Sequence, residues 1–237
     1  MPSKPLLIIQ MGLPPEDIVA QFGEQGRWMQ EALGEDAPAA LIVQPFLGEA
    51  LPDPADVSGA VLTGSWNMVT DREPWSEATA QWVREAMQAQ LPLLGICYGH
   101  QLMAHALGGV VDYHPRGKEV GHYEIEVIAD AAHDPLLANL PARFSALLSH
   151  EQTVITPPAG ARVLARSAHD PHQILRYSDR AVSVQFHPEF TVPLMHACIA
   201  RRAAQLDEEG FDSAAMLQGL AHTPQAQQIL LEFAQRL

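Results

Sequence analysis

Short apolar runs alternate with helix-like segments through the first hundred residues. Four runs have the length and composition of buried strands: 6–11 (LLIIQM), 39–46 (AALIVQPF), 59–64 (GAVLTG) and 91–97 (LPLLGIC). The segments between them, notably 16–33 and 76–90, carry apolar residues at helical spacing. Strands that are separated by helices are joined by crossover connections, which make neighbouring strands parallel. The chain is therefore expected to form an α/β fold around a parallel sheet.

The second half of the chain changes character twice. Five strand-like runs follow one another closely between residues 122 and 187, separated by Pro and Gly turns such as TPPAG (156–160). They are expected to extend the sheet or to add a small antiparallel ribbon. From residue 191 the pattern is helical. Because no internal repeat, low-complexity tract or linker interrupts the sequence, we expect one domain over 1–237, with a core over about 1–190 and a helical extension over 191–237.

Charge and composition exclude several classes of function. The formal net charge is −14 and no Lys/Arg cluster offers a surface for phosphates, so nucleic acid is not an expected partner. No apolar run approaches the roughly 20 residues that a membrane helix needs. No signal-peptide cleavage site follows the N-terminal run, which predicts a cytoplasmic protein without a membrane partner. The two cysteines are far apart and fit no metal spacing, so no metal is expected.

The most informative local feature is GICYG, residues 95–99, which places one cysteine between two glycines where a strand pattern gives way to a helix pattern. It is the cysteine counterpart of the Gly-x-Ser-x-Gly elbow, whose sharp turn exposes a nucleophile. Gly95 and Gly99 are expected because neighbouring backbones approach too closely for a Cβ atom. A helix N-terminus favours the reactive thiolate. Cys97 is therefore a candidate nucleophile, with simple core packing as the alternative for this motif alone.

A nucleophilic cysteine needs a base, and the base needs a group that orients it. A strand of alternating apolar residues ends in His187, Pro188 and Glu189. Pro188 keeps the preceding residue extended, so His187 can project toward the elbow while Glu189 approaches its far nitrogen. We expect a Cys97–His187–Glu189 triad, the alternative for His187 being a buried core histidine. Cys198 lies in an apolar helical run and is expected to be core packing.

Together, LLGICYGHQLMAHALGG (93–109) and VSVQFHPEF (182–190) resemble the class I (triad) glutamine amidotransferases, whose domain releases ammonia from glutamine for a synthetase such as GMP synthase. The resemblance runs from about residue 40 to 190. It implies a flavodoxin-like fold of three layers, with helices on both faces of a mostly parallel sheet. It also implies that Cys97 is the nucleophile, His187 the general base and acid, and Glu189 the orienting group, with no metal or organic cofactor.

The same resemblance suggests the residues that surround the reacting amide. The family carries a Gly-Gly-Pro turn where this chain has Gly64-Ser65-Trp66, and the N–H of Ser65 is retained as an oxyanion donor. The N–H of Tyr98, directly after the nucleophile, is the second donor. Contacts to glutamine are expected from Gly64, Gln101, Ser149, His150, Glu151 and Gln152.

Three functions remain open from the sequence. The first is a glutamine amidotransferase or glutaminase that delivers ammonia to a separate ATP-dependent synthetase, because the Ser-Gly-Gly-x-Asp-Ser loop of a complete GMP synthase does not occur in the chain. The second is a hydrolase of another γ-glutamyl amide or peptide. The third is a regulatory module that binds glutamine without turnover. The amphipathic segment 224–237 is expected to pack on the sheet in preference to docking a partner.

Overall fold

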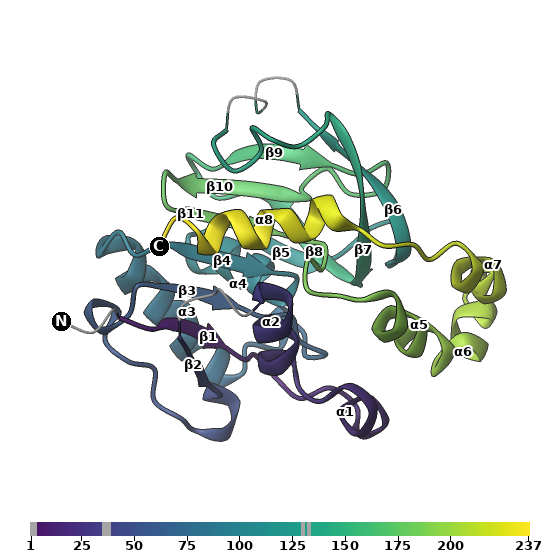
Figure 1. The fold of residues 1–237 in the computed structure, drawn as a ribbon, viewed down its shortest axis with the longest axis horizontal. Coiled ribbons are helices and arrows are strands. Elements are labelled where there is room, and N and C mark those ends of the chain that lie inside the picture. The colour runs from purple at the N-terminus through teal and green to yellow at the C-terminus, as the bar shows by residue number, and fades with distance from the viewer. Residues whose placement is uncertain (1–3, 35–38, 129–130, 132–133) are drawn as a thin grey trace.

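The molecule is built around one large β-sheet with helices packed on it (Figure 1). The structure, a computed structural model, describes residues 4–34, 39–128, 131 and 134–237. Within these residues, a nine-stranded sheet has the order β2-β1-β3-β4-β11-β10-β9-β6-β7. The strands are β1 Leu6–Ile9, β2 Ala40–Val43, β3 Gly59–Leu62, β4 Leu93–Ile96, β6 Glu119–Val127, β7 Arg143–His150, β9 Arg162–Arg166, β10 Ile174–Ser178 and β11 Ala181–Val184.

The part of the sheet from β2 to β11 is parallel. β1 pairs with β2 and β3, and β4 pairs with β3 and β11, all in the parallel sense. β1 to β4 come from the four apolar runs that predicted strands, which confirms the α/β class. β11 is added beside β4 from much later in the chain, so that Ile96 lies opposite Val184. The C-terminal ends of these two strands therefore lie next to each other.

The part of the sheet from β11 to β7 is antiparallel. Two further strands, β5 Val110–Tyr113 and β8 Gln152–Thr156, form a separate antiparallel pair. The middle of the chain thus extends the sheet and also adds a small ribbon. The sequence did not predict β5, because its side chains are largely exposed and lack the apolar alternation of a half-buried strand.

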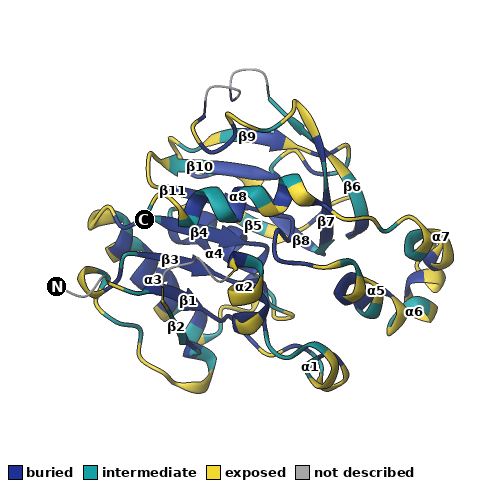
Figure 2. Ribbon diagram, viewed as in Figure 1, coloured by how far each residue is buried: buried dark blue, intermediate teal, exposed yellow. Residues whose placement is uncertain are grey.

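Helices cover both faces of the sheet, as the side chains of β1 show. Leu6 and Ile8 pack in one apolar cluster with side chains of α2 (Gln25–Leu33) and α8 (Pro224–Ala234). Leu7 and Ile9 pack in a second cluster, on the other face, with α3 (Pro74–Gln88) and α4 (Tyr98–Ala106). All four side chains are fully buried, and Figure 2 shows β1 in dark blue. The expected arrangement of three layers is confirmed.

The helical segment expected at residues 16–33 is divided into α1 (Glu16–Phe22) and α2. Gly23 separates them with a φ of 77°, in the left-handed region that favours glycine, and its N–H donates to the carbonyl of Val19. The break lets α2 turn back onto the sheet.

The helical extension is also divided, into α5 (Val192–Ala200), α6 (Ala203–Glu208), α7 (Ser213–Gln218) and α8. Figure 1 shows α5, α6 and α7 grouped beyond β6 and β7, whereas α8 crosses the sheet. The apolar face of α8, including Ile229 and Phe233, is buried in the cluster that contains Leu6. The prediction that this segment packs as core is confirmed. In the described parts of the chain, no helix has both the length and the apolar character needed to cross a membrane.

Candidate active site

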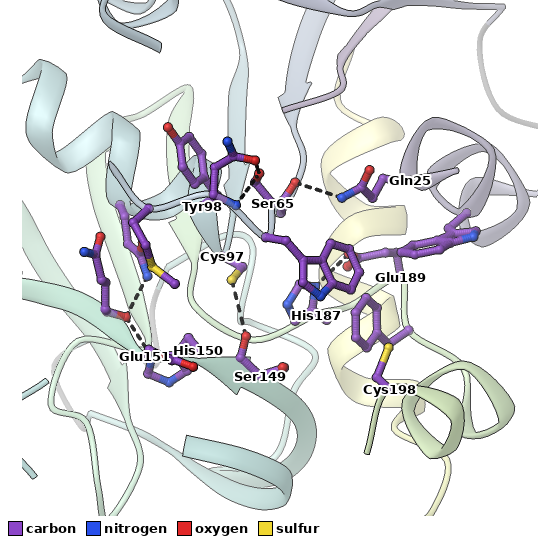
Figure 3. Close-up of a pocket in the computed structure, with 18 of the residues that line it drawn as sticks. Gln25, Ser65, Cys97, Tyr98, Ser149, His150, Glu151, His187, Glu189 and Cys198 are labelled. Carbon is purple, nitrogen blue, oxygen red and sulfur yellow. Dashed lines mark hydrogen bonds and ion pairs between the residues drawn. The ribbon is translucent and has the colours of Figure 1, made fainter. Parts of the chain in front are cut away.

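Cys97 occupies a sharp turn between β4 and α4 and lines a pocket (Figure 3). Its backbone has φ 50° and ψ −101°, a conformation that residues other than glycine rarely adopt. The Cys97 thiol lies 3.8 Å from the carbonyl oxygen of Ser149, to which it donates a hydrogen bond. This strand–turn–helix geometry is the elbow that GICYG predicts. The expectation that the turn exposes its nucleophile is wrong, however, because Cys97 is only 5% exposed where it lines the pocket.

Two glycines permit this turn. A Cβ atom at Gly95 would lie 2.5 Å from the carbonyl oxygen of Gly99. A Cβ atom at Gly99 would lie 2.5 Å from the carbonyl oxygen of Leu62, in β3. Since the obstructing atoms belong to the backbone, any side chain at either position would force the strands and the helix apart. The close approach inferred from the sequence is therefore present.

His187 and Glu189 reach the elbow because β11, which they follow, lies beside β4. The Nδ1 atom of His187 lies 2.8 Å from Oε1 of Glu189. Cys97 and the imidazole line the same pocket and meet at Gly64, where a Cβ atom would lie 2.8 Å from Cε1 of His187 and 3.6 Å from Cβ of Cys97. Phe190 stacks on the ring, with 3.9 Å between the two centroids. The structure thus brings Cys97, His187 and Glu189 together in the order that a triad requires.

The electrostatic surroundings of His187 favour its protonated form. Burial by itself lowers the pKa of His187, but the charges and hydrogen bonds of Glu189 and Cys97 outweigh burial and raise the pKa to about 10. Glu189 is 4% exposed, and its Oε2 has no hydrogen-bond partner among the described residues. A positive imidazolium therefore balances the buried carboxylate.

Two backbone N–H groups of the pocket lack an acceptor among the described residues. Ser65 follows β3, Tyr98 begins α4, and both line the pocket with Cys97. Neither N–H finds an acceptor in the part of the chain that the structure covers. Gly64 lies directly before Ser65, and its carbonyl oxygen accepts a hydrogen bond from Thr63. The role of oxyanion donors that the resemblance implies for Ser65 and Tyr98 therefore stays a prediction.

The predicted glutamine-binding segment, residues 149–152, forms a wall of the same pocket between β7 and β8. Ser149 contacts the thiol through its carbonyl oxygen. His150 lies between two acceptors, with Nε2 3.0 Å from Oε2 of Glu119 and Nδ1 2.9 Å from the carbonyl oxygen of Gln152. The side chain of Gln152 is directed to Thr70, where its Nε2 donates to the hydroxyl at 2.5 Å.

Gln101 joins the elbow helix to this wall. Its Nε2 donates to the carbonyl oxygen of Gln152 at 2.7 Å and to Oε1 of Gln185 at 3.0 Å. The side chain is 4% exposed and lines the pocket. Because the two amide hydrogens are used within the protein, the carbonyl oxygen of Gln101 is the atom available to a ligand.

Glu119 is a functional candidate that the sequence did not reveal. Its buried carboxylate accepts from Nε2 of Gln173 at 2.9 Å and from the hydroxyl of Ser167 at 2.7 Å, in addition to its contact with His150. It therefore fixes the orientation of a pocket side chain from outside the pocket. The segment around Glu119 carries no motif that would have indicated this role.

Gln25, Trp28 and Arg202 also line the pocket and were not predicted, because they come from helical segments far from the elbow in sequence.

Cys198 is buried among apolar residues as expected, and burial raises the pKa of its thiol to about 11. It also contributes to the pocket wall. Within the ranges that the structure covers, no three His, Cys, Asp or Glu side chains are grouped as metal ligands.

Comparison with known proteins agrees with this geometry. Residues 43–203 match the family model for glutamine amidotransferase class-I. The chain is 41% identical over 143 residues to GMP synthase [glutamine-hydrolyzing] of Aeropyrum pernix, a match that covers 60% of this chain and 26% of that protein. It is 34% identical over 142 residues to a subunit of GMP synthase [glutamine-hydrolyzing] from Methanopyrus kandleri, covering 58% and 71%. The match thus spans about a quarter of the first relative.

The fold is found in solved structures as well. A crystal structure of a glutamine amidotransferase from Thermotoga maritima superposes with a TM-score of 0.73 at 22% identity, over 98% of this chain and 97% of that one. The family model covers the elbow, the wall at 149–152 and the His187–Glu189 segment. This chain belongs to the class I glutamine amidotransferase family.

Proposed function

We propose that the chain hydrolyses the side-chain amide of glutamine to glutamate and ammonia through a γ-glutamyl thioester on Cys97. The observation that carries the proposal is the juxtaposition of a strained elbow cysteine with an imidazole whose far nitrogen is held by Glu189 at 2.8 Å. Membership of the class I glutamine amidotransferase family supports it.

In the first step, Cys97 reacts as the thiolate, with its proton held by the imidazolium of His187. Its sulfur attacks the amide carbon and forms the C–S bond. The carbonyl electron pair moves to oxygen, which accepts hydrogen bonds from the N–H groups of Ser65 and Tyr98. The imidazolium of His187 then transfers its proton to the amide nitrogen. The C–N bond breaks, ammonia leaves, and the thioester remains with a neutral His187.

In the second step, water replaces the amine. Neutral His187 takes a proton from water, and the resulting hydroxide adds to the thioester carbon. The C–S bond breaks, the electron pair returns to the sulfur of Cys97, and glutamic acid forms and ionises as it leaves. His187 is again protonated, so the site returns to its starting state without any external reactant other than water.

A coupled assay for glutamate release tests the proposal. The wild-type chain should release glutamate from glutamine, and the Cys97→Ala variant should not. Release from other γ-glutamyl amides but not from glutamine would establish the alternative hydrolase. Binding of glutamine without any release would establish a sensing module and overturn the proposal.

We also propose that the ammonia is used by a separate ATP-dependent synthetase. Support comes from the Methanopyrus kandleri relative, which is named as a subunit of GMP synthase. Affinity capture with the purified chain, followed by an assay for ATP hydrolysis that depends on glutamine, tests this. With the Cys97→Ala variant, free ammonia should still support ATP hydrolysis by the captured fraction, but glutamine should not. If glutamine supports ATP hydrolysis as well as ammonia does in that variant, the delivery proposal is wrong.

A further inference from the structure

Arg202 brings a cation into the pocket from the helical extension. It lies between α5 and α6, is half-buried, and lines the pocket that contains Cys97. Its Nη2 donates to the hydroxyl of Ser149 at 2.7 Å. Its Nε is buried and has no hydrogen-bond partner among the described residues. Part of this guanidinium is therefore held in place while part is unsatisfied.

The carboxylates around Arg202 are engaged elsewhere. Lys118 pairs with Glu151 at 3.0 Å and with Glu209 at 2.8 Å. Neighbouring Arg201 differs, because it pairs with Asp17 at 3.1 Å. Among the residues that the structure describes, Arg202 forms no ion pair of its own.

A half-buried guanidinium without a carboxylate partner is energetically unfavourable. Burial lowers the pKa of Arg202, and the charges of Glu151 and Glu209 offset this only in part. A buried or half-buried charge without a partner is destabilising, and an incoming anion removes that penalty. A planar guanidinium can bind a carboxylate through two parallel N–H donors, whereas the ammonium of a lysine acts as a single point charge. A carboxylate is therefore the anion that suits Arg202 best.

Arg202 and the thiol both contact Ser149, from the same pocket. The carbonyl oxygen of Ser149 accepts from Cys97 at 3.8 Å and its hydroxyl accepts from Arg202 at 2.7 Å. In glutamine, three carbons separate the reacting amide carbon from the α-carboxylate carbon, a span of roughly 5 Å in extended geometry. A substrate with its amide at the thiol therefore directs its other end toward Arg202.

We propose that the guanidinium of Arg202 binds the α-carboxylate of the substrate and so selects γ-glutamyl compounds in which that carboxylate is free. This inference rests on the function proposed above, because it places the reacting amide at Cys97. It makes Arg202 a specificity-determining residue remote from the bonds that change. Loss of such a contact weakens the ground state and the transition state alike.

Calorimetric binding in the Cys97→Ser background tests the inference without requiring turnover. The ligands are glutamine and 4-aminobutanamide, which has the same amide and chain but no α-carboxylate. Arg202→Gln should weaken glutamine binding by about 30-fold, as expected when one partner of a buried charge pair is removed. It should leave 4-aminobutanamide binding within about threefold, and Arg202→Lys should restore part of the glutamine affinity.

Arg201→Gln is the matched control, because it removes an adjacent guanidinium that lines the same pocket but already has a carboxylate partner. Its effect on glutamine binding should stay within about threefold. Equal affinity for glutamine with and without the Arg202→Gln substitution, or an equal loss for both ligands, overturns the inference. If binding depends on Arg202 but the wild-type chain releases no glutamate, the proposed hydrolysis fails while the carboxylate site stands. If the chain binds neither ligand, both fail.

Discussion

A Cβ atom at Gly64 would lie 2.8 Å from Cε1 of His187. The imidazole therefore occupies space that a side chain at residue 64 would otherwise fill. Phe190 confines the ring by stacking on it, with 3.9 Å between the centroids. The position of the His187 imidazole, the proposed base, therefore depends on the absence of a side chain at Gly64.

Gly64→Ala should reduce kcat for glutamine hydrolysis by about 100-fold, because small displacements of a catalytic group have effects of this size. The melting temperature should change little, since the displaced ring lies at the edge of a pocket. Steady-state kinetics and thermal unfolding of the same preparation check both statements. Unchanged kcat in this variant would contradict the assigned position of the base.

Cys97→Ala should abolish glutamate release while the fold remains intact, because replacing a thiol with a hydrogen removes little volume. Glu189→Gln should be less damaging, since an orienting group contributes less than the nucleophile. Circular dichroism and the coupled glutamate assay measure the two effects. A Cys97→Ala protein with wild-type activity would eliminate the mechanism.

The ion pair around His187 predicts how stability depends on pH. Glu189 and Cys97 raise the pKa of His187 to about 10 in the folded state, against an ordinary value of 6.5. Because the folded state holds this proton more tightly than the unfolded state, the stabilisation is complete below pH 6.5 and is lost as the pH rises toward 10.

Urea denaturation at a series of pH values between these limits should show this decline in the free energy of unfolding. Glu189→Gln should flatten it, because a carboxylate that raises the pKa of His187 is removed. A slope that is the same in both proteins would show that the decline has another source.

Removing the buried carboxylate of Glu119 should destabilise the protein. Glu119→Ala leaves His150, Gln173 and Ser167 without their shared acceptor, and a loss of about 3 kcal/mol is expected for such a buried network. Glu119→Gln retains the shape and should be less harmful to stability, yet it should raise the KM for glutamine because His150 loses a charged partner. Urea denaturation and steady-state kinetics separate these outcomes.

The two cysteines provide a comparison of reactivity within one molecule. Iodoacetamide should alkylate Cys97, which lies beside an imidazolium at a helix N-terminus, before Cys198, whose pKa is raised to about 11 by burial. Glutamine should slow the reaction at Cys97. Peptide mapping after brief treatment measures both sites, and faster reaction at Cys198 would show that the elbow is not a working nucleophile site.

Local patterns predicted the elbow and the strand-final His187 because each depends on a few adjacent residues. GICYG fixes a turn through two close backbone contacts, and β11 directs His187 to the end of β4. The same reasoning placed β1 to β4 correctly. These features are encoded within short windows of sequence, where apolar periodicity and glycine positions are informative.

Contacts between distant segments could not be predicted in this way. Arg202 reaches the pocket only because the extension folds back over β6 and β7, and Glu119 reaches His150 only through strand pairing. Neither residue has neighbours that mark it. The division of the helical segment at 16–33 was missed because a single glycine is tolerated within helices, so the sequence does not show that Gly23 adopts the left-handed conformation.

The most direct test of the central claim is a search for the covalent intermediate. Wild-type protein is mixed with glutamine, quenched in acid within one turnover, and digested for mass spectrometry. A γ-glutamyl group should be found on the peptide that contains Cys97, not on the peptide that contains Cys198, and it should disappear as glutamate accumulates. Glutamate release that proceeds with no adduct on Cys97, and that persists in Cys97→Ala, would contradict the account.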